Sequence, residues 1–268
     1  MALMSNIKFQ ISQKALLTLR LVSELKAILP IGIPSNLNTK VHLTAIEQTD
    51  LDAIEKVRES LLSSGISIPV MDFGVGSKKT ELKTDKQEYI RDVCRIASKP
   101  KGSGLFLYNL IRQSKSENIL ELGTCLGISS AYIAMALKHQ LSGKMITMEG
   151  SPARAKIADQ NLKNLGLENY ASVQAGKFQD ILEPHLSETE YIDFAFIDGH
   201  HDGDATVGYF DQLLPKFKNG GIMVFDDIFW SVGMNKAWKT IRRSDSVKDS
   251  FEFKGMGIVQ ILPQNQHQ

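Results

Sequence analysis

Residues 118–129 of the chain read NILELGTCLGIS, and this stretch decides the fold. Ile119–Glu121 has the length and composition of a short buried strand, and Gly123 allows the chain to turn sharply after it. Gly127 and Ser129 then open a helical pattern. A strand that turns through glycine into a helix is the repeating unit of an α/β sheet, so the stretch predicts the first such unit here.

Strand-like runs alternate with amphipathic helical patterns from this point on. The runs are Ile119–Glu121, Met145–Glu149, Ser172–Ala175, Ile192–Ile197 and Ile222–Phe225, and the helical patterns lie near 128–140, 153–165, 178–186 and 204–218. Strand, helix, strand at this period indicates parallel strands with right-handed crossovers. After a last helix near 234–243, the runs Phe251–Lys254 and Gly257–Leu262 predict a hairpin. The expected fold is a doubly wound, mostly parallel seven-stranded sheet with an antiparallel C-terminal hairpin strand.

The first part of the chain predicts an N-terminal helical extension over residues 1–84. One helix is expected within 12–29, and a second from about Asp50 to Ser63, capped by Thr49 and stopped by Gly65. These helices would cover a substrate pocket, form a homodimer, or simply pack on the main domain.

The main domain is expected over residues 85–262, with a frayed tail at 263–268. Thr84 and Gln87 form a capping-box pattern for a helix that ends before Pro100, and a short helix is expected near 105–112.

Composition excludes several classes of protein. The 31 basic and 30 acidic residues leave a formal net charge of +1, which argues against a nucleic-acid partner. No apolar run approaches the roughly 20 residues that span a bilayer, so no membrane segment is expected. The two cysteines cannot form a disulfide framework. We therefore expect a cytoplasmic protein.

The residues that close the predicted strands are polar, and ligands of such sheets bind beyond these strand ends. Gly123 and Gly127 lack the third glycine of the dinucleotide fingerprint, so no pyrophosphate cradle is expected. Glu149 ends the second strand, where a carboxylate can accept hydrogen bonds from both ribose hydroxyls. A nucleoside without phosphate, such as S-adenosylmethionine, suits this combination.

Several blocks in order, namely residues 119–129, 146–149 and 176–181, resemble class I S-adenosylmethionine-dependent methyltransferases, in particular the small-molecule O-methyltransferases similar to catechol O-methyltransferase. The resemblance covers about residues 85–262. It implies that Glu121 and Ser129 reach the methionine end of the cofactor, that Gly123 belongs to the same cofactor motif, and that Met148 and Glu149 belong to the ribose motif. In the block Gly176–Ile181, Gln179 takes the position of the adenine-side glutamine, while Phe178 departs from the family pattern.

Two further segments, residues 197–201 and 225–227, carry acids and histidines. By the same resemblance, Asp198, Asp226 and Asp227 fall on the positions of divalent-metal ligands, with Asp227 replacing an asparagine. Three carboxylates around one cavity are costly unless a cation neutralises them, and oxygen ligands suit Mg²⁺ or a similar ion. Relatives with an Asp-Gly-x-His segment, as in residues 198–201, leave a metal-free reaction open.

His201 falls where the catechol-type enzymes have a catalytic lysine, and a neutral imidazole can accept a proton near neutral pH. The catalytic candidates are therefore His201 and Asp198, with His200 as the rival base. Trp230 and Phe229 would either wall an aromatic acceptor or belong to the core.

The sequence thus predicts a methyltransferase that transfers a methyl group to oxygen on a small hydroxylated or aromatic acceptor. Two alternatives remain at this point. One is a nucleotide-dependent oxidoreductase on a similar sheet. The other is a non-catalytic assembly protein with a cofactor-binding fold.

Overall fold

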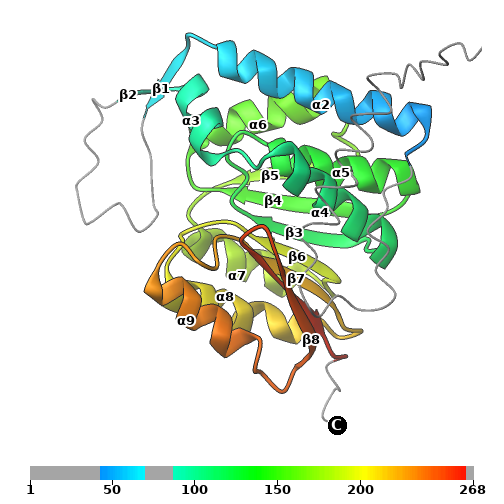
Figure 1. Ribbon diagram of the computed structural model, residues 1–268, viewed down its shortest axis with the longest axis vertical. Coiled ribbons are helices and arrows are strands. Elements are labelled where there is room, and N and C mark those ends of the chain that lie inside the picture. Colours follow the sequence, from blue (N-terminus) through cyan, green and yellow to red (C-terminus); the bar gives the residue numbers. More distant parts are fainter. Residues whose placement is uncertain (1–42, 70–86, 264–268) are drawn as a thin grey trace, which may run out of the picture.

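The computed structural model describes residues 43–69 and 87–263, which form a seven-stranded sheet between two layers of helices (Figure 1). The strand order is β5-β4-β3-β6-β7-β9-β8. The strands are β3 (Asn118–Leu122), β4 (Lys144–Glu149), β5 (Ala171–Ala175), β6 (Phe194–Ile197), β7 (Gly221–Phe225), β8 (Val247–Phe253) and β9 (Met256–Ile261). The first five are parallel, and β9 runs antiparallel to both of its neighbours. The predicted fold class is confirmed.

The helices cover the sheet in two groups with separate cores. Helices α2 (Ala45–Ser63), α3 (Ile90–Ala97), α4 (Lys101–Ser114), α5 (Ile128–Gln140) and α6 (Pro152–Asn164) contribute to one core, and α7 (Phe178–Glu188), α8 (Gly203–Leu213) and α9 (Val232–Ile241) contribute to the other. A short 3-10 helix, η1 (Leu214–Lys216), follows α8.

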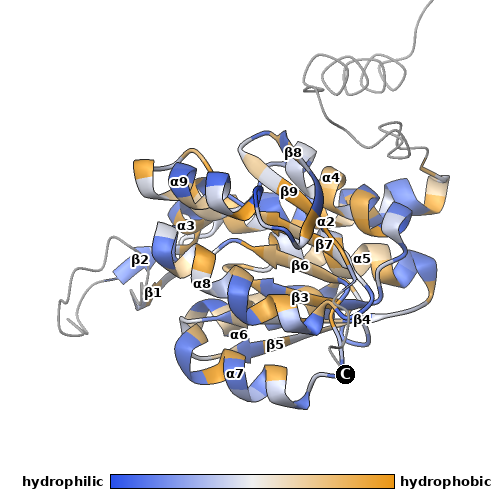
Figure 2. Ribbon diagram, turned by 90° about the horizontal axis from the view of Figure 1, so that it is seen from below, coloured by the Kyte–Doolittle hydropathy of each residue, from blue (hydrophilic) through white to orange (hydrophobic). Residues whose placement is uncertain are grey.

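The central strands are apolar because helices bury both of their faces. All four residues of β6 are buried, as are Ile119 to Leu122 of β3. Figure 2 shows this hydrophobic character in the central strands and more mixed colouring on the surrounding helices. Parallel strands buried in this way bring their carboxyl ends to one edge of the sheet, where the polar residues lie.

The predicted start of the second helix is wrong by five residues. Helix α2 begins at Ala45, because Thr44 forms a complete capping box with Glu47. Thr49 instead donates its hydroxyl to the carbonyl of Ala45, within the helix. Gly65 is not the stop either, since the helix is closed by Ser64 in an extended conformation.

The predicted capping box at Thr84 and Gln87 also needs correction. Gln87 lies in β2 (Gln87–Tyr89), which pairs antiparallel with β1 (Ser67–Pro69), and α3 begins only at Ile90. The local sequence pattern favoured a helix start at Thr84, but the pairing of Gln87–Tyr89 with Ser67–Pro69 makes this segment a strand. Thr84, the helix expected within 12–29 and the tail beyond residue 263 lie outside the described residues.

Helix α2 shares the core of the sheet domain. Its Leu51 and Ile54 are fully buried. Tyr132 of α5 donates its hydroxyl to Glu55 at 2.7 Å, and a ring nitrogen of His139 lies 3.0 Å from the Asp50 carboxylate. None of the helices in the described part of the chain is long and apolar enough to cross a membrane.

We expect Ile54→Ala to lower the free energy of unfolding of the whole domain by about 2–5 kcal/mol, because it leaves a cavity in the shared core. Ile46→Ala is the matched control, since Ile46 is on the same helix and 73% exposed. Urea unfolding followed by circular dichroism measures both. Equal stabilities for the two variants would show that α2 contributes little to the core.

Candidate active site

Backbone hydrogen bonds connect the carboxyl ends of β3, β4 and β6. The amides of Gly123 and Thr124 donate to the carbonyl of Met148 at 2.9 and 3.2 Å. The amide of Asp198 donates to the carbonyl of Leu122 at 2.8 Å. Gly123 has a φ of +107°, and a Cβ there would stand 2.1 Å from the carbonyl oxygen of Asp198. Only glycine fits this position, which brings the ends of β3 and β6 into direct contact.

Glu149 lies at this edge with both carboxylate oxygens directed by backbone amides. The amide of Cys125 donates to Oε2 and the amide of Ser151 donates to Oε1, each at 2.8 Å. The side chain is largely buried. These two amides fix the direction of the carboxylate at the end of β4, which suits it to accept hydrogen bonds from a ligand there.

Glu121 is the most deeply buried acid of the site. Its Oε2 accepts hydrogen bonds from the hydroxyls of Ser130 and Thr147, while its Oε1 is buried without a hydrogen-bond partner among the described residues. Burial raises the pKa of Glu121, although the serine and threonine hydroxyls favour the charged form. A buried acceptor with no partner is costly, and a cationic or hydrogen-bonding ligand would relieve that cost.

The two histidines of the predicted segment point in different directions. The His201 ring has Nε2 4.0 Å from Asp198 and Nδ1 3.6 Å from Asp227. His200 instead packs among aromatic rings, where its Nδ1 is hydrogen-bonded to the hydroxyl of Tyr209 and its ring meets Phe178 edge to face. Of the two, His201 is therefore the one that faces the carboxylates.

A lysine that the sequence analysis did not single out completes the cluster. The ammonium of Lys99 contacts the carboxylate of Asp226 and lies 3.2 Å from Asp198. Burial raises the pKa of Asp198 to about 7, against the lowering effect of the Lys99 charge. Nothing in the spacing of Lys99 relative to the strand ends points to this contact, because the residue lies between α3 and α4, in a part of the chain that carried no chemical pattern.

The three carboxylates predicted as metal ligands do not converge on one point. Asp198, His201 and Asp227 come together closely enough to share an ion, but Asp226 is outside that group. The Lys99 ammonium lies between Asp198 and Asp226. The predicted set of Asp198, Asp226 and Asp227 therefore does not fit a divalent ion while the lysine keeps this position.

The other predicted cofactor residues lie around the same edge. Ser129 is buried in the first turn of α5, and Met148 is fully buried in β4 within the second core. Gln179 is exposed in the first turn of α7.

Phe229 and Trp230 are exposed by 57% and 70%, which excludes the core interpretation for both. The centroids of the Trp230 and His201 rings are 6.2 Å apart, so the indole stands beside the imidazole. The buried tryptophan of this region is Trp238, whose ring nitrogen donates to Glu252 at 2.6 Å.

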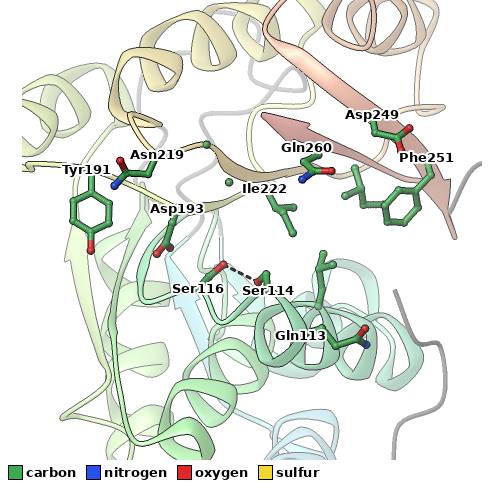
Figure 3. A pocket seen from close by; sticks show the side chains of 14 residues that line it. Gln113, Ser114, Ser116, Tyr191, Asp193, Asn219, Ile222, Asp249, Phe251 and Gln260 are labelled. Atoms are coloured by element: carbon green, nitrogen blue, oxygen red, sulfur yellow. Dashed lines mark hydrogen bonds between the residues drawn. The ribbon is translucent and has the colours of Figure 1, made fainter. Parts of the chain in front are cut away.

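A cavity of about 540 Å³ lies at the other end of the parallel strands from these site residues. Figure 3 shows its lining. Its lining includes Ser114, Ser116 and Asp193, beside the amino ends of the parallel strands. The Asp193 carboxylate accepts hydrogen bonds from the amides of Glu117 and Asn118, so it serves to join the loops there. None of the predicted site residues lines this cavity.

This open sheet, with a reversed strand near one edge and acids at the carboxyl ends of its strands, shares its fold with solved O-methyltransferases. Residues 120–228 match the family model described as a methyltransferase domain. The resemblance seen in the sequence is thereby confirmed for this segment of the chain.

Individual proteins similar to the chain carry related names. It is 35% identical over 127 residues to a catechol O-methyltransferase of Niastella koreensis, an alignment that covers 47% of this chain and 55% of the relative. It is 28% identical over 131 residues to caffeoyl-CoA O-methyltransferase 2 of Petunia hybrida, covering 48% and 52%. The chain thus spans about half the length of these relatives.

The fold is shared with solved structures. The O-methyltransferase of Bacillus cereus in complex with SAH aligns with a TM-score of 0.58 at 20% identity, over 81% of this chain and 97% of that one. The tomaymycin-synthesis O-methyltransferase TomG of Streptomyces achromogenes aligns with a TM-score of 0.55 at 19% identity, over 83% and 92%.

We expect Gly123→Ala to destabilise the fold by about 1–3 kcal/mol more than Gly166→Ala, because the new methyl group would clash with Asp198. Gly166 is the matched control, since it also has a positive φ, of +65°, but a Cβ there meets no atom within 4 Å. Denaturant unfolding of both variants measures the difference. Similar losses would mean that backbone strain alone, and not the contact with β6, demands glycine at position 123.

Proposed function

We propose that this chain is an S-adenosylmethionine-dependent O-methyltransferase acting on a small acceptor with a phenolic or similar hydroxyl. The observation that carries the proposal is the meeting of Glu121, Glu149 and Asp198 at the ends of three neighbouring strands, β3, β4 and β6. An edge lined with acids suits a ligand that brings hydroxyl donors and positive charge.

The cofactor would be held by residues of this edge. Glu149 would accept hydrogen bonds from the ribose, and Gln179 would reach the adenine side. Glu121, whose Oε1 is buried and accepts no hydrogen bond from any described residue, would hold the methionine end together with Ser129. Gly123, Met148 and Asp198 would line the cofactor site beside them. When bound, S-adenosylmethionine supplies an electrophilic methyl carbon, which accepts an electron pair from the acceptor oxygen as its bond to sulfur breaks.

His201 would act as the general base. A neutral imidazole accepts the proton of the acceptor hydroxyl, which makes the oxygen a better nucleophile. The carboxylates of Asp198 and Asp227 flank the ring on both nitrogens and would stabilise the imidazolium that forms. His200 is already engaged with Tyr209, which favours a supporting role for it.

The exposed aromatic pair supports an aromatic acceptor. Trp230 stands beside His201 and offers a flat apolar face at the point where the acceptor oxygen would meet the base. The names of the relatives, catechol and caffeoyl-CoA O-methyltransferase, favour a phenolic hydroxyl as well.

We expect Glu149→Gln to weaken S-adenosylmethionine binding by about 1.5–3 kcal/mol, the range for hydrogen bonds to a charged group. Isothermal titration calorimetry without acceptor measures the affinity, and circular dichroism checks the fold. Glu168→Gln is the control, because Glu168 is exposed. An affinity equal to that of the control would remove Glu149 from the cofactor site, and no binding by the wild type would refute the proposed function.

We expect His201→Ala to reduce kcat about 100-fold or more, because general-base catalysis contributes at least that much to such reactions. Cofactor affinity should stay nearly unchanged, since proton transfer is felt in the transition state. The assay transfers a labelled methyl group from S-adenosylmethionine to phenolic acceptors. His200→Ala should reduce kcat less, and the reverse order would assign the base to His200.

A further inference from the structure

We propose that Lys99 is the fixed cation of the acceptor site, standing where the carboxylates at the ends of β6 and β7 would otherwise need a divalent metal. The inference deepens the proposed methyltransferase function and rests on it. The observation behind it is the contact of one largely buried ammonium with two carboxylates, the partly exposed Asp198 and the buried Asp226.

The backbone around Lys99 is fixed on both sides. The amide of Ser98 donates to the carbonyl of Cys94 and closes α3. The carbonyl of Pro100 accepts hydrogen bonds from Ser103 and Gly104 at 2.9 and 3.0 Å and starts α4. A residue before proline is also restricted to extended conformations. Lys99 is therefore presented to the site by a rigid junction between two packed helices.

The positive charge of the largely buried Lys99 is compensated by two neighbouring carboxylates. Its side chain is 13% exposed, and those of Asp198 and Asp226 are 10% and 5% exposed. A buried ammonium is costly unless it is paired and hydrogen-bonded, and the same holds for a buried carboxylate. Removing the lysine would leave two uncompensated acids side by side.

A divalent ion and this ammonium compete for the same oxygens. Mg²⁺ and Ca²⁺ bind carboxylate oxygens at about 2.0–2.6 Å, so an ion shared by Asp198 and Asp226 would need the space that the Lys99 ammonium holds. Binding of such an ion would require the Lys99 side chain to break both ion pairs and move its ammonium group out of the site. The remaining group of Asp198, His201 and Asp227 holds the base of the proposed reaction.

The presence of Lys99 in place of a metal ion affects which acceptors the site can bind. An ammonium has three N–H donors; Asp226 accepts a hydrogen bond from one of them, and Asp198, an ion-pair partner at 3.2 Å, can take a second. The third can donate to the acceptor oxygen and stabilise the negative charge that develops there as its proton leaves. A metal ion with several open positions favours two adjacent oxygens, whereas one N–H serves a single oxygen. The site should therefore accept compounds with one phenolic hydroxyl as well as catechols.

Manganese binding tests the replacement without any assay of activity. Free Mn²⁺ is followed by electron paramagnetic resonance as it is titrated into wild type, Lys99→Ala and Lys101→Ala. Lys101 is the matched control, because it lies two residues away and pairs with Asp52 at 3.3 Å on the more exposed side. We expect Lys99→Ala to bind Mn²⁺ at least about tenfold more tightly than the other two, since it frees the carboxylates as ligands.

Wild type that binds Mn²⁺ as tightly as Lys99→Ala, or a folded Lys99→Ala that gains no affinity, would overturn the proposal. If Lys99→Ala fails to fold by circular dichroism, Lys99→Gln removes the charge at similar length, and the same two criteria apply to it.

Activity gives a second, separate readout. Wild type should keep its rate in excess chelator and should methylate a phenol with one hydroxyl; loss of the rate in chelator would overturn the role of Lys99. If calorimetry shows no S-adenosylmethionine binding, the proposed function fails, and with it the role of Lys99 in the reaction. The manganese titration would then still decide whether Lys99 holds the place of a metal.

Discussion

The close approach of Gly123 to the carbonyl oxygen of Asp198 is the constraint on which the candidate site depends. It joins the end of β3 to the end of β6, while hydrogen bonds from the amides of Gly123 and Thr124 join β3 to β4. Three acids on three different strands are thereby held at one edge. A side chain at position 123 would push β3 and β6 apart, and the acids would no longer face one ligand.

Each of these acids is stabilised in a different way, and the difference suits a different role. Glu149 accepts hydrogen bonds from two backbone amides, which fix its direction. Glu121 is held by two hydroxyls on one oxygen and has no hydrogen bond on the other among the described residues. Asp198 is paired with an ammonium from outside the sheet. The first two arrangements suit a polar, partly cationic ligand, and the third supplies charge for the chemistry beside it.

The sheet and its crossover helices could be predicted from the sequence to within a few residues, because period and strand spacing are local properties. The strand at 144–149, the helix at 128–140 and the C-terminal hairpin are examples. The start of α2 and the pairing of β1 with β2 could not be predicted from the sequence. Two threonines compete as caps at Thr44 and Thr49, and the partner of Gln87–Tyr89 lies about twenty residues away in the chain.

The sequence by itself determined which acids and histidines stand at the strand ends, since each lies at the end of its own strand or within a few residues after it. Only the tertiary structure decided which of these residues contact one another. It turns His201 toward Asp198 and Asp227, turns His200 toward Tyr209, and brings Lys99 from the junction of α3 and α4 to Asp198 and Asp226. Such contacts depend on the packing of helices against the sheet, which no local pattern encodes. The three carboxylates by themselves indicated a metal ion. In the folded chain, two of them instead contact Lys99, which lies about one hundred residues before Asp198 in the sequence.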